Sequence, residues 1–112
     1  MLSFQKLDVY RCAVEFVGLA TAIAAKVPRA GADLRDQLRR AAFSVPLNIA
    51  EAAGRASGAD AARHYAIARG SAMQCVAALD ILRTRNIVQD QQYRQATDLL
   101  APIVAMLTKL CR

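Results

Sequence analysis

The spacing of the apolar residues restricts the fold of this chain more than any other feature of its sequence. Apolar residues recur at alternating steps of three and four, which is the period of a helix with one buried side. Strand-like alternation, long linkers and internal repeats are absent from the 112 residues. We therefore expect residues 1–112 to form one all-α domain, an antiparallel up-and-down four-helix bundle. The first helix is expected to begin at Ser3 and to be ended by Pro28 and Gly31, and the second is expected to begin near Asp33 and to be followed by a turn at Gly54, Ser57 and Gly58. The third is expected from about Asp60 to about Thr84 with Asn86 as its stop, and the fourth from Asp90 onward. Ser3, Asp33 and Asp90 are the expected N-caps.

The first of these helices carries two apolar stripes. One stripe comprises Leu7, Tyr10, Val14, Val17, Thr21 and Ala24, and the other comprises Val9, Ala13, Phe16, Ala20, Ile23 and Val27. Two stripes cover a wider arc than a single four-helix bundle needs to bury. The excess predicts that the chain assembles into a homo-oligomer.

The segment from Gln37 to Arg55 carries an apolar stripe on one side of the second helix and a polar stripe on another. The apolar positions are Leu38, Ala41, Ala42, Val45, Ile49 and Ala52, and the polar positions are Arg40, Ser44, Asn48, Glu51 and Arg55. The polar stripe is either a solvated face or a packed polar seam. Serine and asparagine are unfavourable inside helices unless a partner holds them, which favours the seam. Glu51 is expected to pair with Arg55, four residues on, or with an arginine of another subunit.

Glycine and proline interrupt three of the expected helices. Gly70 costs the third helix about 1 kcal/mol relative to alanine. We interpret it as the point, Gly70–Ser71, at which a neighbouring helix crosses closely; the alternative is a tolerated surface glycine. Pro46 and Pro102 are predicted to kink the second and fourth helices, although each proline is also suited to start a new helical segment.

The charge of the chain favours anionic partners. It has 15 basic and 9 acidic residues, a net charge of +6, and aromatic residues make up only 5% of it. Stacking of bases on exposed rings is therefore excluded as a main binding mode. Sequence-independent contacts with the phosphates of RNA or DNA remain, alongside the alternative of an acidic protein partner. The arginines expected at one end of the bundle, diluted there by aspartates, are Arg29, Arg35, Arg39, Arg83 and Arg85.

The residue types that carry catalysis are sparse. Cys12, Cys75 and Cys111 form no CxxC pair, and their spacing to His64 matches no standard zinc site. Phosphate-binding glycine loops are absent, and Glu51 is a lone acid near the centre of its helix. We therefore expect no catalytic, cofactor-binding or metal-binding residues and no enzymatic activity. An odd number of free thiols and no apolar run long enough to span a membrane indicate a cytoplasmic protein.

Three motifs resemble those of a known family of small four-helix-bundle proteins, encoded in intervening sequences of 23S ribosomal RNA genes. They are RRAAFSVPLNIAEAAGR, IARGSAMQ at 67–74 and the opening FQKLDVYRCAVEF, so the resemblance covers nearly the whole chain. Two positions depart from the family pattern, because Ala52 replaces its usual glycine and Gln74 replaces a glutamate that often follows the Gly-Ser pair. The matching positions are Arg39, Arg40, Ser44, Pro46, Asn48, Ile49, Ala50, Glu51, Gly54, Arg55, Gly70 and Ser71.

The resemblance implies an antiparallel bundle that assembles into a ring, commonly a pentamer, with no catalytic activity. It also implies a partner such as a nucleic acid or a reverse transcriptase. The predicted function is thus a homo-oligomeric scaffold that binds nucleic acid through arginines. The alternative is a protein-interaction module or adaptor with no nucleic-acid role. The polar seam or oligomer contact is predicted to involve Arg40, Ser44, Asn48, Glu51, Arg55, Gly70 and Ser71.

Overall fold

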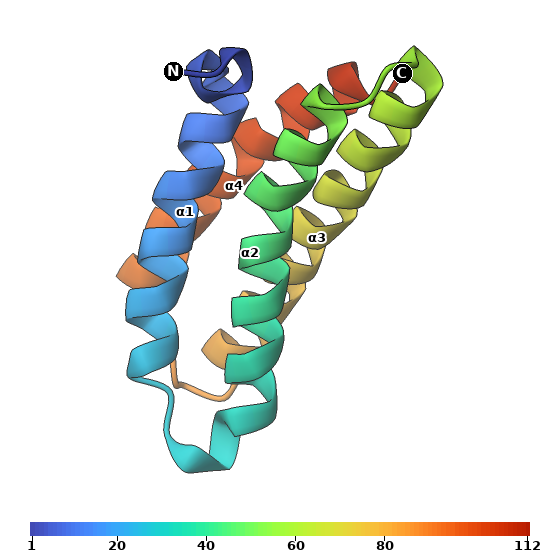
Figure 1. The fold of residues 1–112 in the computed structure, drawn as a ribbon. Helices are drawn as coiled ribbons and strands as arrows, with labels where there is room; N and C mark the ends of the chain where they lie inside the picture. Colours follow the sequence, from blue (N-terminus) through green and yellow to red (C-terminus); the bar gives the residue numbers. More distant parts are fainter.

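The computed structural model describes residues 1–112 as four long helices that run alternately up and down (Figure 1). They are α1 (Asp8–Ala25), α2 (Ala32–Ala53), α3 (Gly58–Thr84) and α4 (Asp90–Leu110), preceded or joined by the short 3-10 helices η1 (Ser3–Lys6) and η2 (Arg29–Gly31). The bundle measures 44 × 23 × 21 Å. The expected all-α four-helix fold is confirmed.

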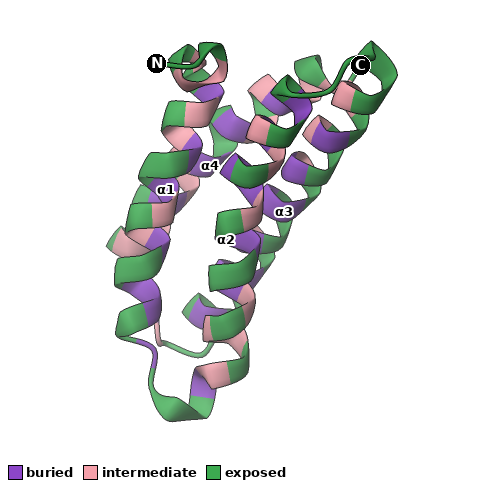
Figure 2. Ribbon diagram, viewed as in Figure 1, coloured by how far each residue is buried: buried purple, intermediate pink, exposed green.

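Each helix packs against its two neighbours in the bundle, and the contact between α2 and α3 is the most extensive. Small side chains bring these two helices close, since alanines fill much of both buried faces: Ala41, Ala42, Ala52, Ala68, Ala72 and Ala78. Larger side chains such as Phe16, Leu79 and Ile103 are fully buried in the same core. The buried residues follow one side of every helix (Figure 2), as the period of the apolar residues predicts.

The two apolar stripes of the first helix have different environments. Every member of the stripe that includes Phe16 and Ala20 is buried. In the other stripe, Val14 and Thr21 are exposed, while Tyr10 and Val17 are half-buried. The single chain therefore leaves part of the apolar surface of α1 uncovered.

Several predicted helix ends are off by one to five residues. Ser3 begins η1 and does not cap α1, which starts at Asp8 after Leu7. Asp33 and Asp90 lie in the first turns of α2 and α4, where their negative charge interacts favourably with the helix dipole, but neither is the N-cap. The cap of α3 is Ser57, whose Oγ accepts a hydrogen bond from the backbone N–H of Asp60 at 3.1 Å.

Asn86 lies just beyond the end of α3 and stops the helix. It adopts a left-handed backbone with φ of 60°. Its N–H donates to the carbonyl of Arg83 at 2.9 Å, and the N–H of Ile87 donates to the carbonyl of Leu82 at 2.9 Å. This pair of bonds is the Schellman motif, for which asparagine is the best residue after glycine.

Both interior prolines lie within uninterrupted helices. α2 passes through Pro46 and α4 passes through Pro102 without a new segment beginning at either. The alternative of a helix start at these residues is therefore wrong. The predicted kinks are not established and stay a prediction.

Candidate assembly surface and buried polar seam

Four polar side chains meet between α2 and α3. The Oγ atoms of Ser44 and Ser71 lie 2.7 Å apart, and the Nδ2 of Asn48 donates to the Oγ of Ser44 at 3.0 Å and to its carbonyl at 2.9 Å. The Oδ1 of Asn48 lies 3.2 Å from the Nδ1 of His64. His64 and Ser71 are only 8% and 7% exposed. We call Ser44, Asn48, His64 and Ser71 the polar seam.

The bonds of Asn48 settle the direction of its hydrogen bond with the imidazole of His64. A carbonyl only accepts, so the group of Asn48 that faces the Ser44 carbonyl must be its amide nitrogen. Its oxygen therefore faces His64, so the Nδ1 of the ring carries a proton and donates to it. The Nε2 of His64 is buried without a hydrogen-bond partner. The seam is thus complete on the Nδ1 side of the ring and incomplete on the Nε2 side.

The polar stripe predicted from the sequence divides into two parts. Ser44 and Asn48 belong to the seam inside the protomer, whereas Arg40, Glu51 and Arg55 are exposed. Glu51 forms an ion pair with Arg55, the first of the two predicted partners. The guanidinium of Arg40 donates to the Oε1 of Gln37 at 3.1 Å. Exposed pairs of this kind contribute little to stability.

The close helix crossing expected at Gly70 is not found within the protomer. Gly70 is exposed, and a Cβ built on it would meet no atom within 4 Å. Its neighbour Ser71 is buried in the seam instead. His64 was not predicted as a seam residue, although it precedes Ser71 by seven residues and so shares its side of a helix.

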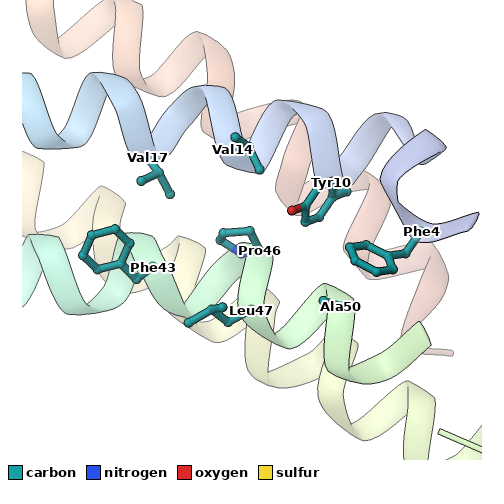
Figure 3. A pocket seen from close by; sticks show the side chains of 8 residues that line it. All are labelled: Phe4, Tyr10, Val14, Val17, Phe43, Pro46, Leu47 and Ala50. Carbon is teal, nitrogen blue, oxygen red and sulfur yellow. The ribbon is translucent and has the colours of Figure 1, made fainter. Parts of the chain in front are cut away.

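A shallow apolar groove runs between α1 and α2 (Figure 3). Its volume is about 380 Å³, and Pro46 and Ala50 from α2 face Tyr10 and Val17 from α1 across it. The ring of Phe4 from η1 packs edge-on against Tyr10, with centroids 5.0 Å apart, and closes one end. The groove is lined by Phe4, Tyr10, Val14, Val17, Phe43, Pro46, Leu47 and Ala50.

The rim of this groove exposes large apolar side chains to solvent. Leu47 is 66% exposed, Phe43 is 49% exposed and Val14 is 46% exposed. All three line the same groove, and exposed apolar side chains gathered in this way make it a candidate interaction site. Sequence reasoning found the excess of apolar surface on α1 but missed Phe43 and Leu47, because they lie on the outer side of α2 among charged residues.

The five predicted phosphate-binding arginines differ in their surroundings. The guanidinium of Arg35 lies 3.2 Å from the carboxylate of Asp36, and that of Arg83 stacks 3.7 Å above the ring of Tyr93. Arg29, Arg39 and Arg85 are exposed and have no acidic partner. Arg29 and Arg85 lie in or beside the two turns at the same end of the bundle, opposite the chain termini (Figure 1).

The thiols lie apart from one another, and all three are free. Burial raises the pKa of the Cys75 thiol to about 12. Cys111 accepts a long contact of 3.8 Å from the guanidinium of Arg69. No three His, Cys, Asp or Glu side chains lie close enough together to hold a metal ion, and none of the helices combines the length and hydropathy that a membrane span requires.

Comparisons with known proteins agree with this architecture. The model of a family described as 23S rRNA-intervening sequence protein matches residues 5–109. A solved structure, described as a protein with unknown function from the S23 ribosomal protein family of Bacteroides thetaiotaomicron, superimposes with a TM-score of 0.86. That alignment covers 93% of this chain and 98% of the other at 21% identity, so it supports the fold. No curated protein matches the chain.

Proposed function

The chain belongs to the 23S rRNA-intervening sequence protein family, and we propose that it acts as a non-enzymatic helical scaffold that assembles with copies of itself. The observation that carries this proposal is the apolar patch around the groove between α1 and α2. Its exposed rim comprises Val14, Phe43 and Leu47. Full burial of an exposed Val, Leu or Phe side chain contributes about 1.5–3 kcal/mol, and these three side chains would regain part of that, so covering the patch would favour association.

The assembled form that we propose is a pentameric ring, the state implied by the family resemblance. Light scattering coupled to size exclusion at micromolar concentration measures it directly. A pentamer would have five times the 12.1 kDa mass of one chain. A monomer would refute self-assembly, whereas a dimer would refute only the pentamer.

A pair of leucine substitutions tests whether the groove is the contact. Leu47→Asp places a charge on the rim of the groove and should lower the measured mass toward that of the monomer. Leu110→Asp is the matched control, because Leu110 is 38% exposed at the far end of α4 and does not line this groove. An unchanged mass for Leu47→Asp, or dissociation by Leu110→Asp alone, would place the contact elsewhere.

Nucleic-acid binding is a second candidate function, and a separate observation favours it. Arg29, Arg39 and Arg85 have no acidic partner, and a ring of five copies would carry each of them five times. Guanidinium groups free of carboxylates are available to phosphates. The net charge of +6 per chain would draw an anionic polymer to such a ring.

The test is a fluorescence-anisotropy titration of labelled RNA and DNA at several salt concentrations. The affinity is expected to show little sequence preference and to fall as the salt concentration rises. For a duplex, the slope of log K against log salt should be about −0.9 for each phosphate that the protein neutralises. Arg29→Glu combined with Arg85→Glu should weaken binding and leave assembly intact. Arg112→Glu, near the chain termini at the other end of the bundle, is the control. Assembly without binding at low salt would instead support the protein-interaction module, with a reverse transcriptase or another protein as its partner.

A further inference from the structure

Gly70 has no role within the protomer that explains a glycine. It lies inside α3, where glycine costs about 1 kcal/mol relative to alanine. No glycine of the chain has a positive φ, so the backbone at Gly70 does not require one. A methyl group there would meet nothing within 4 Å. At Gly70, a helix of another molecule could approach the backbone of α3 more closely than at any residue that has a side chain.

The outer face of α3 around Gly70 is uncharged. The exposed residues between Arg63 and Asp80 are Ala66, Ile67, Gly70, Met73, Gln74 and Ala77. This face, from Ala66 to Ala77, is about 17 Å long at 1.5 Å per residue. Ile67 and Met73 lie on either side of Gly70 at a spacing of three residues and are 40% and 46% exposed. A helix surface that contacts only water usually carries charged residues, and this one carries none.

The acidic end of this face complements basic residues beside one end of the groove. Asp80 follows the face and Arg63 precedes it, whereas on α2 the exposed Arg39 and Arg40 precede Leu47 and the ion pair of Glu51 with Arg55 follows it. An α3 helix laid antiparallel along α2 brings Asp80 toward Arg39 and Arg40, and Arg63 toward the Glu51–Arg55 pair. In that register, Gly70 falls opposite Leu47, halfway along the groove.

We propose that the groove between α1 and α2 receives the outer face of α3 from a second copy of this chain. Ile67 and Met73 enter the groove as apolar ridges, and Gly70 lets the backbone of α3 approach the exposed side chain of Leu47. The two surfaces of this contact are different parts of the chain. The contact is therefore head-to-tail, and it generates a closed ring or an open filament rather than an isolated dimer. The inference rests on the self-assembly proposed above and names the surfaces that mediate it.

Cysteine cross-linking between different variants tests the two surfaces. The background protein carries Cys12→Ala and Cys111→Ala and keeps Cys75, which is fully buried. One variant adds Leu47→Cys and the other adds Met73→Cys. The two are mixed in equal amounts, dissociated under mild conditions and reassembled so that their subunits exchange. A short bismaleimide is then applied to each variant alone and to the mixture. Covalent dimers are expected from the mixture and not from either variant alone. Light scattering on the background protein reports assembly separately.

The outcomes distinguish this inference from the proposed function. Dimers from Leu47→Cys alone would show groove-to-groove pairing and overturn the inference. An assembled protein with no cross-link in the mixture would also overturn it and would leave self-assembly standing. A monomeric background protein would overturn self-assembly, and the inference with it.

Substitution of the glycine gives an independent measurement. Gly70→Ala should stabilise the helix of an isolated protomer, and we expect it to weaken assembly because a methyl group would hold the two helices apart. Gly58→Ala is the control, since Gly58 is an exposed residue of the same helix with nothing within 4 Å of its Cβ position. We expect the apparent dissociation constant of the oligomer to rise at least about tenfold for Gly70→Ala, equivalent to about 1.4 kcal/mol, and to stay unchanged for Gly58→Ala. Equal behaviour of the two variants would make Gly70 a tolerated surface glycine and refute the close approach.

Discussion

Replacing Asn48 with leucine tests whether the polar seam contributes to the stability of the α2–α3 pair. Asn48 is the centre of the seam, because its amide holds Ser44 on its own helix and its oxygen accepts from His64 on α3. Leucine has a similar size but can make none of these bonds. The helices should still form, since the apolar stripes are untouched, but the free energy of unfolding should fall.

The magnitude of the loss follows from the groups left behind. The Oγ of Ser44 keeps Ser71 as a partner. The Nδ1–H of His64 loses its only acceptor, in a side chain whose Nε2 already has no partner. An unsatisfied buried donor costs about 1–3 kcal/mol, and with the lost bonds to Ser44 we expect about 2–4 kcal/mol in total. For a chain of this length, each kcal/mol lowers the Tm by about 4 °C.

The double variant Asn48→Leu with His64→Leu should recover a large part of this loss. Removing both partners of a buried hydrogen bond with apolar groups of similar shape is close to neutral. A double-mutant cycle isolates their coupling, which we expect to be about 1–3 kcal/mol. The control is Gln95→Leu, an exposed position on α4 that should change stability by less than about 0.5 kcal/mol.

The assay is urea unfolding followed by far-ultraviolet circular dichroism. All variants must be compared at one protein concentration, because the stability of an assembling protein depends on it. A loss below about 0.5 kcal/mol for Asn48→Leu would mean that the seam behaves as a solvated face. If the double variant loses the sum of the two single-variant losses in unfolding free energy, Asn48 and His64 are not energetically coupled.

Three further predictions concern the turn end of the bundle and the core. Gly31→Ala would bring a methyl group to 2.8 Å from the Cγ1 of Val27 and 3.4 Å from the Cδ1 of Ile87, so we expect thermal melts to show a loss of about 1–3 kcal/mol. Asn86 has a φ of 60°, so Asn86→Ala should cost about 1 kcal/mol in the same assay and Asn86→Gly should cost less; equal losses would contradict the role of the left-handed cap. Burial raises the pKa of the Cys75 thiol from 9.0 to about 12, so the folded protein should retain this proton while the unfolded chain loses it. Its contribution to stability should therefore be complete below pH 9 and be lost as the pH rises toward 12, and alkylation of Cys75 at pH 8 should require unfolding, as peptide mapping would show.

The sequence by itself determined the class of fold and the buried side of each helix. The stripe of α1 that contains Phe16 and the stripe of α2 that contains Leu38 and Ile49 are buried as their spacing predicts. Asn86 was recognisable as the end of α3 because its tolerance of a left-handed backbone is a property of the residue itself. These features depend on neighbours within one or two helical turns, and such neighbours can be read from one stretch of sequence.

Only the tertiary structure decided which polar and apolar groups are covered. Ser44 and Glu51 lie on similar sides of α2, yet Ser44 is bonded to Ser71 and Glu51 is exposed. The difference depends on what α3 presents at each level, and helical spacing carries no information about that. The same holds for Gly70, whose sequence context predicted a close approach that the protomer does not contain. Periodicity defines the faces of a helix, whereas the packing of distant segments determines which face meets a partner and which remains open.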